Sequence, residues 1–180
     1  GYHQRDLREL SPSEFRDDLA RAGEALENAC GQRVEGYRAP GWLKRSDMWA
    51  LEVLAEAGYR YDSSIKPLFL SHASVPEARF AHRYEFGTRS IWEFPISTIS
   101  LGGLLFPVGA GNYFRQLPDS LVRRAVAHWH RRYESPFNMY FHTWELDPQQ
   151  PQIAAASPLT RIRLYRNLHK VPEVLRLAQR

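Results

Sequence analysis

The sequence predicts an α/β fold built on a parallel sheet or barrel. Residues 34–37 and 59–62 are predicted to be short strands, because β-branched and aromatic side chains gather in the first and alternate in the second. The residues between them carry apolar side chains at helical spacing, and both connections are short. A strand, a helix and a strand in this order form a βαβ unit, in which the two strands run parallel.

The composition predicts one folded domain. With 180 residues, 43% of them hydrophobic, the chain is large enough to bury a core. Its 24 basic and 20 acidic residues are interspersed without a run of five like charges, so no nucleic-acid partner is expected. The single cysteine, Cys30, excludes an internal disulfide and a cysteine-based zinc site, and we expect it to be buried as a small apolar residue.

No apolar run approaches the roughly 18 residues that a membrane-spanning helix needs, so no transmembrane segment is expected. The chain begins at Gly1 without an initiator methionine, and we expect it to be an excerpt from a longer protein. The localisation is therefore left open by the sequence.

A helix is predicted from Pro12 to the glycine at position 31. Ser11 is a favourable N-cap, Pro12 fits the first helical position, and Glu14 completes a capping box. Gly31 supplies the C-terminal stop. One apolar stripe is expected to face the core, formed by Phe15, Leu19, Ala22 and Leu26.

The first predicted strand runs into a constrained loop that contains Arg38. Pro40 biases Ala39 toward an extended conformation, which holds the strand end open. In α/β sheets and barrels chemistry gathers at strand ends, and an arginine there can hold a carboxylate in a bidentate geometry. Arg38 is therefore either a site residue or a solvated surface residue beside a proline.

The second predicted helix is capped by Ser46 and stops at Gly58. Asp62 falls at the end of the strand that follows, before two serines. This carboxylate either caps a turn or supports catalysis. The buried face of the helix is expected to consist of Trp49, Val53, Leu54 and Ala57.

Residues 66–90 contain prolines and show weak periodicity, so we expect a long loop or a small irregular insertion with His72 and His82 at its surface. Residues 91–95 are a third strand candidate. The glycine-punctuated apolar segment 101–114 lacks the lysine and hydroxyl residue of a phosphate-binding loop, which excludes nucleotide binding. Its glycines instead allow backbone and aromatic side chains to approach a sugar ring closely.

A further helix is predicted from Asp119 to about residue 132. The strand predicted at 137–142 ends on His142, a polar residue of catalytic type. A last helix is predicted over residues 161–179, and Pro172 should kink or break it. The inward residues of the helix that starts at Asp119 are expected to be Leu121, Val122, Ala125, Val126 and Trp129.

With Arg38, Asp62 and His142 each at a predicted strand end, the chain resembles the polysaccharide deacetylases of carbohydrate esterase family 4, the nodulation-protein-type homology domain. It is most similar to the branch associated with exosortase and exopolysaccharide gene clusters. The segments that carry the resemblance are residues 36–40 (GYRAP), 49–64 (WALEVLAEAGYRYDSS), 112–118 (NYFRQLP) and 140–148 (YFHTWELDP). Together they span nearly the whole chain in the family's order.

The resemblance implies an incomplete, distorted (β/α) barrel of the polysaccharide deacetylase type, with the N-terminal strands absent. Residues 1–180 would form one truncated domain, with residues 149–180 as a C-terminal extension whose helix packs on it. It also implies a metal-dependent hydrolase that removes N-acetyl groups from the amino sugars of a polysaccharide. By the family's pattern Arg38 orients the base, His142 is the general acid, and Asp62 supports it and keeps it cationic.

The family's divalent metal, zinc in the first place, is held by one aspartate and two histidines. The aspartate pair would lie upstream of Gly1, and the second histidine of the ligand motif falls on Gln4, with His3 one residue away. Either His3 takes over as the metal ligand through a small shift, or this copy has lost a ligand, since an amide is a poor zinc ligand beside imidazole. The isolated chain is therefore expected to be catalytically incomplete.

The resemblance leaves two functions open. The first is a polysaccharide N-deacetylase, for which we expect Arg38, Asp62 and His142 to open onto one face with residues 101–114 at its rim. The second is a non-catalytic carbohydrate-binding remnant of the same fold, which the glutamine at position 4 motivates. Four aromatic side chains are candidates either for flat faces that bind sugar rings or for core and rim packing: Trp42, Tyr113, Phe114 and Trp144.

Overall fold

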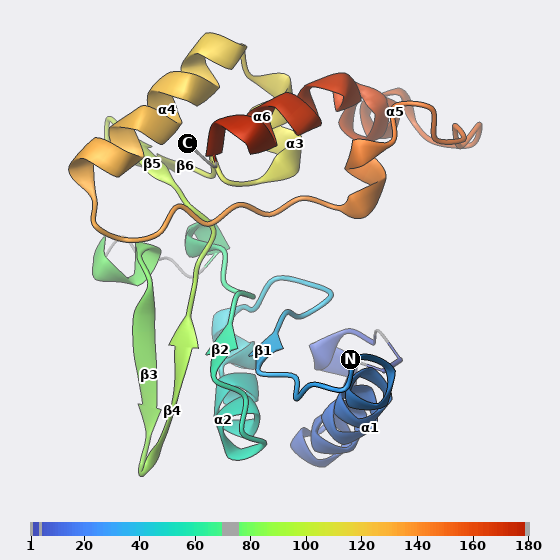
Figure 1. Ribbon diagram of the computed structural model, residues 1–180, viewed down its shortest axis with the longest axis vertical. Coiled ribbons are helices and arrows are strands. Elements are labelled where there is room, and N and C mark those ends of the chain that lie inside the picture. Colours follow the sequence, from blue (N-terminus) through green and yellow to red (C-terminus); the bar gives the residue numbers. More distant parts are fainter. Residues whose placement is uncertain (1, 4, 70–75, 179–180) are drawn as a thin grey trace. The chain divides into compact units, whose positions relative to one another are not determined.

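The computed structural model describes residues 2–3, 5–69 and 76–178 (Figure 1). Gln4 and His72, to which the sequence drew attention, lie outside the described residues. The chain divides into two compact units, Gly1–Pro95 and Ile96–Arg180. The predicted α/β class is confirmed, because the first unit combines a mixed sheet with helices that pack on it.

The sheet of the first unit has four strands in the order β1-β2-β4-β3. β2 pairs in parallel with both β1 and β4, and β3 runs antiparallel to β4. Helix α2, Trp49–Glu56, connects β1 to β2, so the predicted βαβ unit is confirmed. The strands span Gly36–Tyr37 (β1), Tyr61–Asp62 (β2), His82–Phe86 (β3) and Arg89–Glu93 (β4).

Helix α1, Pro12–Cys30, begins and ends as predicted. The Ser11 side chain accepts a hydrogen bond from the backbone N–H of Glu14, and the Glu14 carboxylate accepts one from the backbone N–H of Ser11 at 2.8 Å. This reciprocal capping box satisfies two N–H groups that the helix itself leaves free. Gly31 closes the helix in the left-handed conformation, with φ 68°.

The buried face of α1 is shorter than predicted. Phe15 and Leu19 are buried, Ala22 is half-buried and Leu26 is exposed. Cys30 was expected to be buried and is exposed. It is the last residue of α1, and residues 24–30 at this end of the helix are all exposed. Both predictions fail for one reason: helical periodicity defines a face but not how far the neighbouring elements extend along it.

Helix α2 begins differently from the prediction. Ser46 lies in a 3-10 turn, Arg45–Asp47, and does not cap the helix. The Asp47 carboxylate instead accepts a hydrogen bond from the Lys44 backbone N–H at 3.0 Å. Ala57, predicted to be buried, is the exposed C-cap residue.

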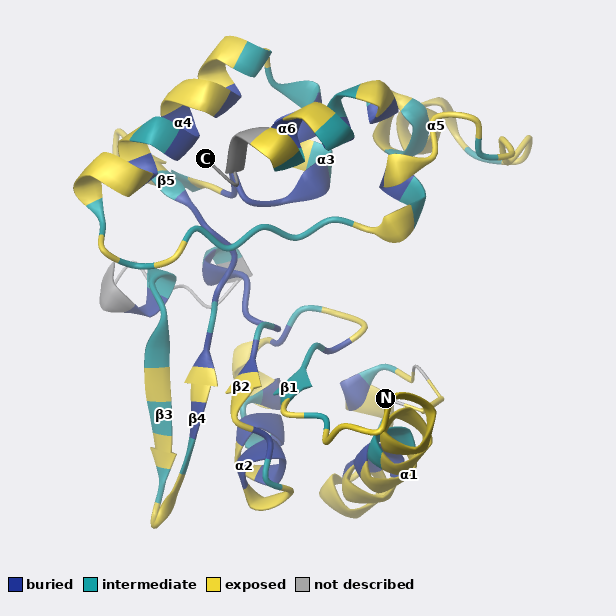
Figure 2. Cartoon of the chain, viewed as in Figure 1, coloured by how far each residue is buried: buried dark blue, intermediate teal, exposed yellow. Residues whose placement is uncertain are grey.

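The core of the first unit fills the space between α1, α2 and one face of the sheet (Figure 2). The ring of Phe15 makes edge contacts with Tyr37 and Trp49, at centroid distances of 5.6 and 5.7 Å. Edge-to-face aromatic pairs of this kind add stability beyond the apolar area that they bury. The larger buried members are Leu7, Phe15, Leu19, Leu43, Leu51, Leu54, Tyr59, Ile65 and Ile91.

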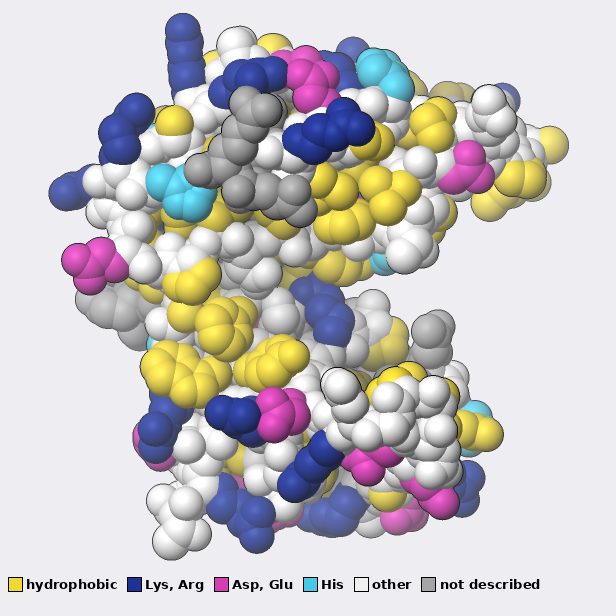
Figure 3. All heavy atoms as spheres, in the orientation of Figure 1, with side chains coloured by type: hydrophobic (Ala, Val, Ile, Leu, Met, Phe, Trp, Pro, Cys, Tyr) yellow, Lys and Arg dark blue, Asp and Glu magenta, His cyan; other side chains and the backbone are white. Residues whose placement is uncertain are grey.

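The other face of the sheet exposes aromatic side chains. Tyr61 on β2 and Trp92 on β4 are register partners, and each is 46% exposed. The ring of Phe94 lies 6.2 Å from Tyr61 and 6.4 Å from Trp92. Figure 3 shows hydrophobic side chains gathered over this part of the sheet.

The prediction of a long loop or a small irregular insertion over residues 66–90 is wrong for its second half, which is a regular hairpin. β3 and the start of β4 form a hairpin there, which turns at Gly87 with φ 60°. His82 lies on β3 and is half-buried, with Nδ1 2.8 Å from the carbonyl oxygen of Phe80. Along β3 the exposed Arg83 and Glu85 alternate with His82, Tyr84 and Phe86, which are half-buried. This period-two pattern is typical of a strand, and it was overlooked in the sequence.

In the second unit the glycine-punctuated segment forms a hairpin followed by a helix. β5, Ile99–Leu101, and β6, Leu104–Phe106, are antiparallel. Gly102 and Gly103 form the turn with φ 57° and 82°, a conformation that two-residue hairpin loops require. Helix α3, Gly111–Gln116, follows.

Helix α4, Asp119–Arg132, matches its predicted span, and its inward residues are buried except for Leu121, which is 46% exposed.

The predicted C-terminal helix is in fact two helices, α5 (Pro158–Tyr165) and α6 (Val171–Ala178). The break lies at Asn167, whose φ is 58°, and Pro172 sits in the first turn of α6, where its missing N–H costs nothing. The core of this unit consists of Phe114, Val122, Val126, Val171 and Val174.

Residues 137–142 are extended but do not form the predicted strand. A single parallel bridge joins Tyr140 to Ala110. Phe137, Met139 and Phe141 are half-buried and pack against the core formed by the helices, so these apolar residues lose solvent contact without joining a sheet. His142 therefore ends an extended segment and precedes the 3-10 turn Thr143–Leu146.

None of the helices within the described residues is long and apolar enough to cross a membrane.

Candidate functional site

Three polar side chains lie at the ends of adjacent parallel strands in the first unit. Arg38 directly follows β1, Asp62 is the last residue of β2, and Glu93 is the last residue of β4. The register places Tyr37 opposite Asp62 and Asp62 opposite Glu93, so the three strands end at one level. The carboxyl ends of parallel strands are the edge at which α/β proteins assemble sites.

Asp62 is fully buried and holds the turn that follows β2. Its two oxygens accept hydrogen bonds from Ser64, one from the backbone N–H and one from the hydroxyl, both at 2.7 Å. The Ser64 hydroxyl in turn accepts the backbone N–H of Ala39 at 2.7 Å. The predicted turn role of Asp62 is thus present, and through Ser64 it also fixes the loop that carries Arg38.

Glu93 is fully buried beside Asp62, and the two carboxyl groups lie within hydrogen-bonding reach of each other. Burial raises the pKa of Asp62, against the opposing effect of hydrogen bonds from Glu93 and Ser64 and of the Arg38 charge. Burial, and then the Asp62 charge, raise the pKa of Glu93 well above its ordinary value. The pair therefore holds a proton at pH values at which exposed carboxyl groups are ionised.

Contacts with Ser63 and Trp42 orient the Arg38 guanidinium. It donates a hydrogen bond to the carbonyl oxygen of Ser63, and it lies over the ring of Trp42 at 4.0 Å from the centroid. The Lys66 ammonium lies 5.8 Å from the same ring. Cation–π contacts of this kind orient a planar guanidinium, so Arg38 is a held side chain rather than a solvated one.

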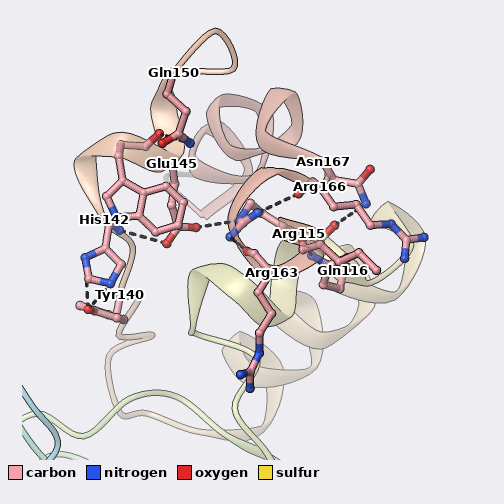
Figure 4. Close-up of polar contacts among 11 residues, drawn as sticks. Arg115, Gln116, Tyr140, His142, Glu145, Gln150, Arg163, Arg166 and Asn167 are labelled. Carbon is pink, nitrogen blue, oxygen red and sulfur yellow. Dashed lines mark hydrogen bonds and ion pairs between the residues drawn. The ribbon is translucent and has the colours of Figure 1, made fainter. Parts of the chain in front are cut away.

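In the second unit, His142 is exposed and its surroundings fix its backbone (Figure 4). The His142 N–H donates to the Glu145 carboxylate at 3.2 Å, and the Glu145 N–H donates to the His142 carbonyl at 2.9 Å. The Tyr140 hydroxyl lies 2.6 Å from Nε2 of His142. The Trp144 ring stacks on the imidazole, with centroids 5.4 Å apart and planes 16° apart.

Glu145 is anchored by a buried ion pair. Nε of Arg115 donates to the Glu145 carboxylate at 2.8 Å, and both side chains are buried (Figure 4). The other nitrogens of Arg115 donate to the carbonyl oxygens of Arg166 at 2.7 Å and Arg163 at 2.9 Å, at the end of α5. The guanidinium therefore links α3, the turn after His142 and the C-terminal segment, and its hydrogen bonds offset the cost of burying the charge.

Comparison with known proteins adds to this geometry. Residues 63–179 match a family described as a domain of unknown function, DUF3473. The chain belongs to this family. Residues 1–61 of the DUF3473 chain match the polysaccharide deacetylase family, which confirms the resemblance seen in the sequence. Arg38 lies in that part, whereas Glu93, His142 and Glu145 lie in the DUF3473 part.

The DUF3473 chain is also similar to a crystal structure from Mycobacterium smegmatis that is described as a polysaccharide deacetylase. The identity is 22% and the TM-score is 0.47. The match covers 73% of this chain and 42% of the other, so the DUF3473 chain spans less than half of that protein's length. No curated protein matches the chain.

The aromatic candidates for sugar binding differ in exposure. Tyr113 is 40% exposed on α3, whereas Phe114 is fully buried in the core of its unit. Phe114 therefore belongs to the packing alternative. One face of Trp42 is covered by Arg38, and Trp144 is half-buried between His142 and Arg115, whose guanidinium carbon is 5.7 Å from its ring.

The described residues do not fit a zinc site. His3 is exposed, and its backbone N–H and that of Tyr2 donate to the Asp18 carboxylate at 3.0 and 2.9 Å. Within the described residues no three His, Cys, Asp or Glu side chains gather closely enough to hold a metal ion. One imidazole is too few, because zinc sites use about three protein ligands.

Glu93, Arg115 and Glu145 were not identified from the sequence. Arg115 and Glu145 lie inside the segments that carry the family resemblance, at 112–118 and 140–148. The resemblance therefore drew attention to both segments, but it did not predict that these two residues pair. Glu93 lies in the predicted strand 91–95, where alternation with Trp92 placed it on the inward face. The convergence of His142 with Arg38 and Asp62 stays a prediction, since these residues belong to different units.

Proposed function

We propose that the whole protein is a hydrolase that removes N-acetyl groups from the amino sugars of a polysaccharide. The observation that carries the proposal is the placement of Arg38 and Asp62 at the ends of adjacent parallel strands, where the polysaccharide deacetylase match ends. Arg38, which Ser63 and Trp42 hold, would orient the base of the reaction. Asp62 would keep the Arg38 loop in place through Ser64.

His142 is proposed as the general acid. Hydrolysis of an amide requires that the departing amine receive a proton, and a positioned histidine contributes about 10²–10⁴-fold to such a step. Its exposure allows contact with a substrate, while Glu145 fixes its backbone and Tyr140 engages Nε2. A divalent metal, with zinc as the expected ion, belongs to the proposal for the whole protein only. His3 is its candidate ligand in this chain, and no step is assigned to the metal because the described residues do not fit its site.

The proposal is tested by acetate release from a soluble oligomer of N-acetylglucosamine, with the whole protein. His142→Ala is expected to lower kcat by about 10²–10⁴-fold while KM changes little, because the proton donor is lost and the sugar contacts remain. His128→Ala, which removes an exposed histidine of α4, is the matched control and should leave kcat unaltered. Undiminished acetate release by His142→Ala would refute the role of His142.

A carbohydrate-binding remnant is the second candidate, because Gln4 stands where the family's ligand motif has a histidine. The isolated 180-residue chain is expected to bind zinc no more tightly than its exposed histidines do, since one ligand does not hold the ion against water. Isothermal titration of zinc into the chain, into His3→Ala and into His128→Ala checks this. Tight one-to-one binding that only His3→Ala abolishes would mean that further ligands complete a site around His3. A whole protein that binds the sugar oligomer but releases no acetate with zinc present would favour the remnant.

A further inference from the structure

Asp62 and Glu93 form a buried carboxyl pair, and the sequence predicted a role for Asp62 but none for Glu93 or for the pair. The two residues are register partners at the ends of parallel strands β2 and β4, so their side chains leave the same face of the sheet next to each other. Both are fully buried, and their carboxyl groups lie within hydrogen-bonding reach of each other. No N–H or O–H donor outside the pair reaches Oε2 of Glu93 within the part of the chain that the structure describes.

A hydrogen bond between two carboxyl groups requires a proton on one of them, because an ionised carboxylate only accepts. The surrounding hydrogen-bond donors indicate that the proton is on Glu93. Both oxygens of Asp62 accept hydrogen bonds from Ser64, as an ionised carboxylate does. Among the described residues, Glu93 accepts only the Ile65 N–H, at Oε1 and 3.1 Å. Oε2 of Glu93 is thus the oxygen left to carry the hydrogen.

We propose that Glu93 is a positioning residue: it stays protonated at neutral pH and donates to the Asp62 carboxylate, which fixes Ser64 and the Arg38 loop. The Ser64 hydroxyl links Asp62 to the loop that carries Arg38, since it donates to Asp62 and accepts from the Ala39 N–H. With one proton on the pair, a single negative charge faces the single positive charge of Arg38. The effect on catalysis rests on the proposed function, whereas the protonation of Glu93 does not.

The other groups that face the pair support one negative charge. Tyr37 on β1 and Tyr84 on β3 have raised pKa values, chiefly through burial and then through the carboxylate charges, with that of Tyr84 at about 12. Both are therefore neutral at physiological pH. His82, the register partner of Glu93 on β3, has Nδ1 next to the Phe80 carbonyl. Helix α2 packs against β4 through apolar side chains.

Protonation of Glu93 makes folding depend on pH with a known sign. Above the ordinary glutamate pKa of about 4.3, the unfolded chain has an ionised Glu93, and folding must take up a proton. Because the pKa of Glu93 is raised in the folded chain, its contribution is complete below the unfolded pKa and is lost as pH rises toward the folded pKa. In that window this group lowers the folding equilibrium constant about tenfold for each pH unit.

Glu93→Gln tests this in the 180-residue chain. The glutamine amide donates to Asp62 without a titratable proton, so the variant should lack the tenfold-per-unit fall between pH 5 and 7 and gain stability relative to wild type as pH rises. The exposed Glu85 on β3 is the matched control, and Glu85→Gln should keep the wild-type slope. Urea unfolding at each pH measures the slopes. Equal slopes for Glu93→Gln and wild type would overturn the proposal.

A second measurement needs no variant to fold. Carboxyl carbon-13 spectra of the glutamate-labelled wild-type chain should show one glutamate resonance at the protonated chemical shift at pH 7, assigned to Glu93. A fully ionised set of glutamates at pH 7 would overturn the proposal even if every variant unfolded.

The catalytic consequence is measured in the whole protein. Glu93→Ala should lower kcat for acetate release more than tenfold with KM nearly constant, and Glu93→Gln should restore most of that loss. An equal loss in both variants would contradict positioning by a donated hydrogen bond. If the whole protein releases no acetate at all, the proposed function fails while the pH slopes and the carbon-13 spectra still decide the state of Glu93.

Discussion

Replacing Glu145 by alanine is expected to destabilise the chain by about 3–5 kcal/mol. The substitution leaves the Arg115 guanidinium buried and without the Glu145 carboxylate that pairs with it, and an uncompensated buried charge is among the most costly single defects in a protein. It also removes the acceptor for the His142 N–H, so the turn that carries His142 should loosen. The free energy of unfolding, measured with urea at constant m-value, gives the first effect, and amide exchange at His142 gives the second.

The matched control is the exposed ion pair of the same unit. Glu173 pairs with Arg123 at 2.8 Å, and both side chains are about half exposed. Glu173→Ala should therefore cost only about 0–1 kcal/mol, because solvent screens the pair. Glu145→Ala and Glu173→Ala with equal effects would show that Arg115 relaxes to solvent, which would contradict its role as a rigid link between α3 and the end of α5.

The features that were predictable from the sequence depend on neighbours close along the chain. The capping box of Ser11 and Glu14 and the left-handed Gly31 are decided by a few adjacent residues, and the structure shows both. The same holds for the placement of Arg38 and Asp62 at strand ends, because the βαβ unit is itself a local pattern.

The features that were missed depend on partners far along the chain. Residues 137–142 have strand-like composition, but among the described residues only Ala110 forms a β-bridge with them, and their apolar side chains pack on helices instead. The pairing of Arg115 with Glu145 joins residues 30 positions apart, and nothing local in either segment encodes it. Glu93 becomes significant only when the sheet places it beside Asp62.

One glycine of residues 101–114 serves a contact inside the chain. The glycines of this segment were expected to permit close approach to a sugar ring, which stays a prediction. At Gly109 the group that approaches closely is the backbone carbonyl of Asn138, which a Cβ atom would strike. Tyr140 then donates its N–H to the Gly109 carbonyl at 2.7 Å. The glycine thus positions the extended segment that leads to His142.

Trp129→Ala is expected to destabilise the chain by about 3–5 kcal/mol, as for other large aromatic side chains removed from a core. Trp129 is 1% exposed on α4, and its ring contacts Tyr133 and Phe137 at centroid distances of 5.0 and 5.7 Å. Its indole N–H donates to the Ser135 carbonyl at 2.8 Å, so the truncation also leaves that carbonyl without this donor. Ser135 and Phe137 lie at the start of the extended segment that leads to His142, and the loss of their contacts with Trp129 should raise amide exchange along residues 137–142.

Leu121→Ala on the same helix is the control that separates the predicted face of α4 from the observed one. The sequence placed Leu121 inward with Trp129, whereas the structure leaves it 46% exposed. Its truncation should cost less than about 1 kcal/mol, because little apolar area returns to water and no cavity forms. Urea unfolding of both variants measures the difference. A loss of several kcal/mol for Leu121→Ala would mean that this side chain is buried after all and that the apolar face of α4 is as wide as its sequence pattern predicts.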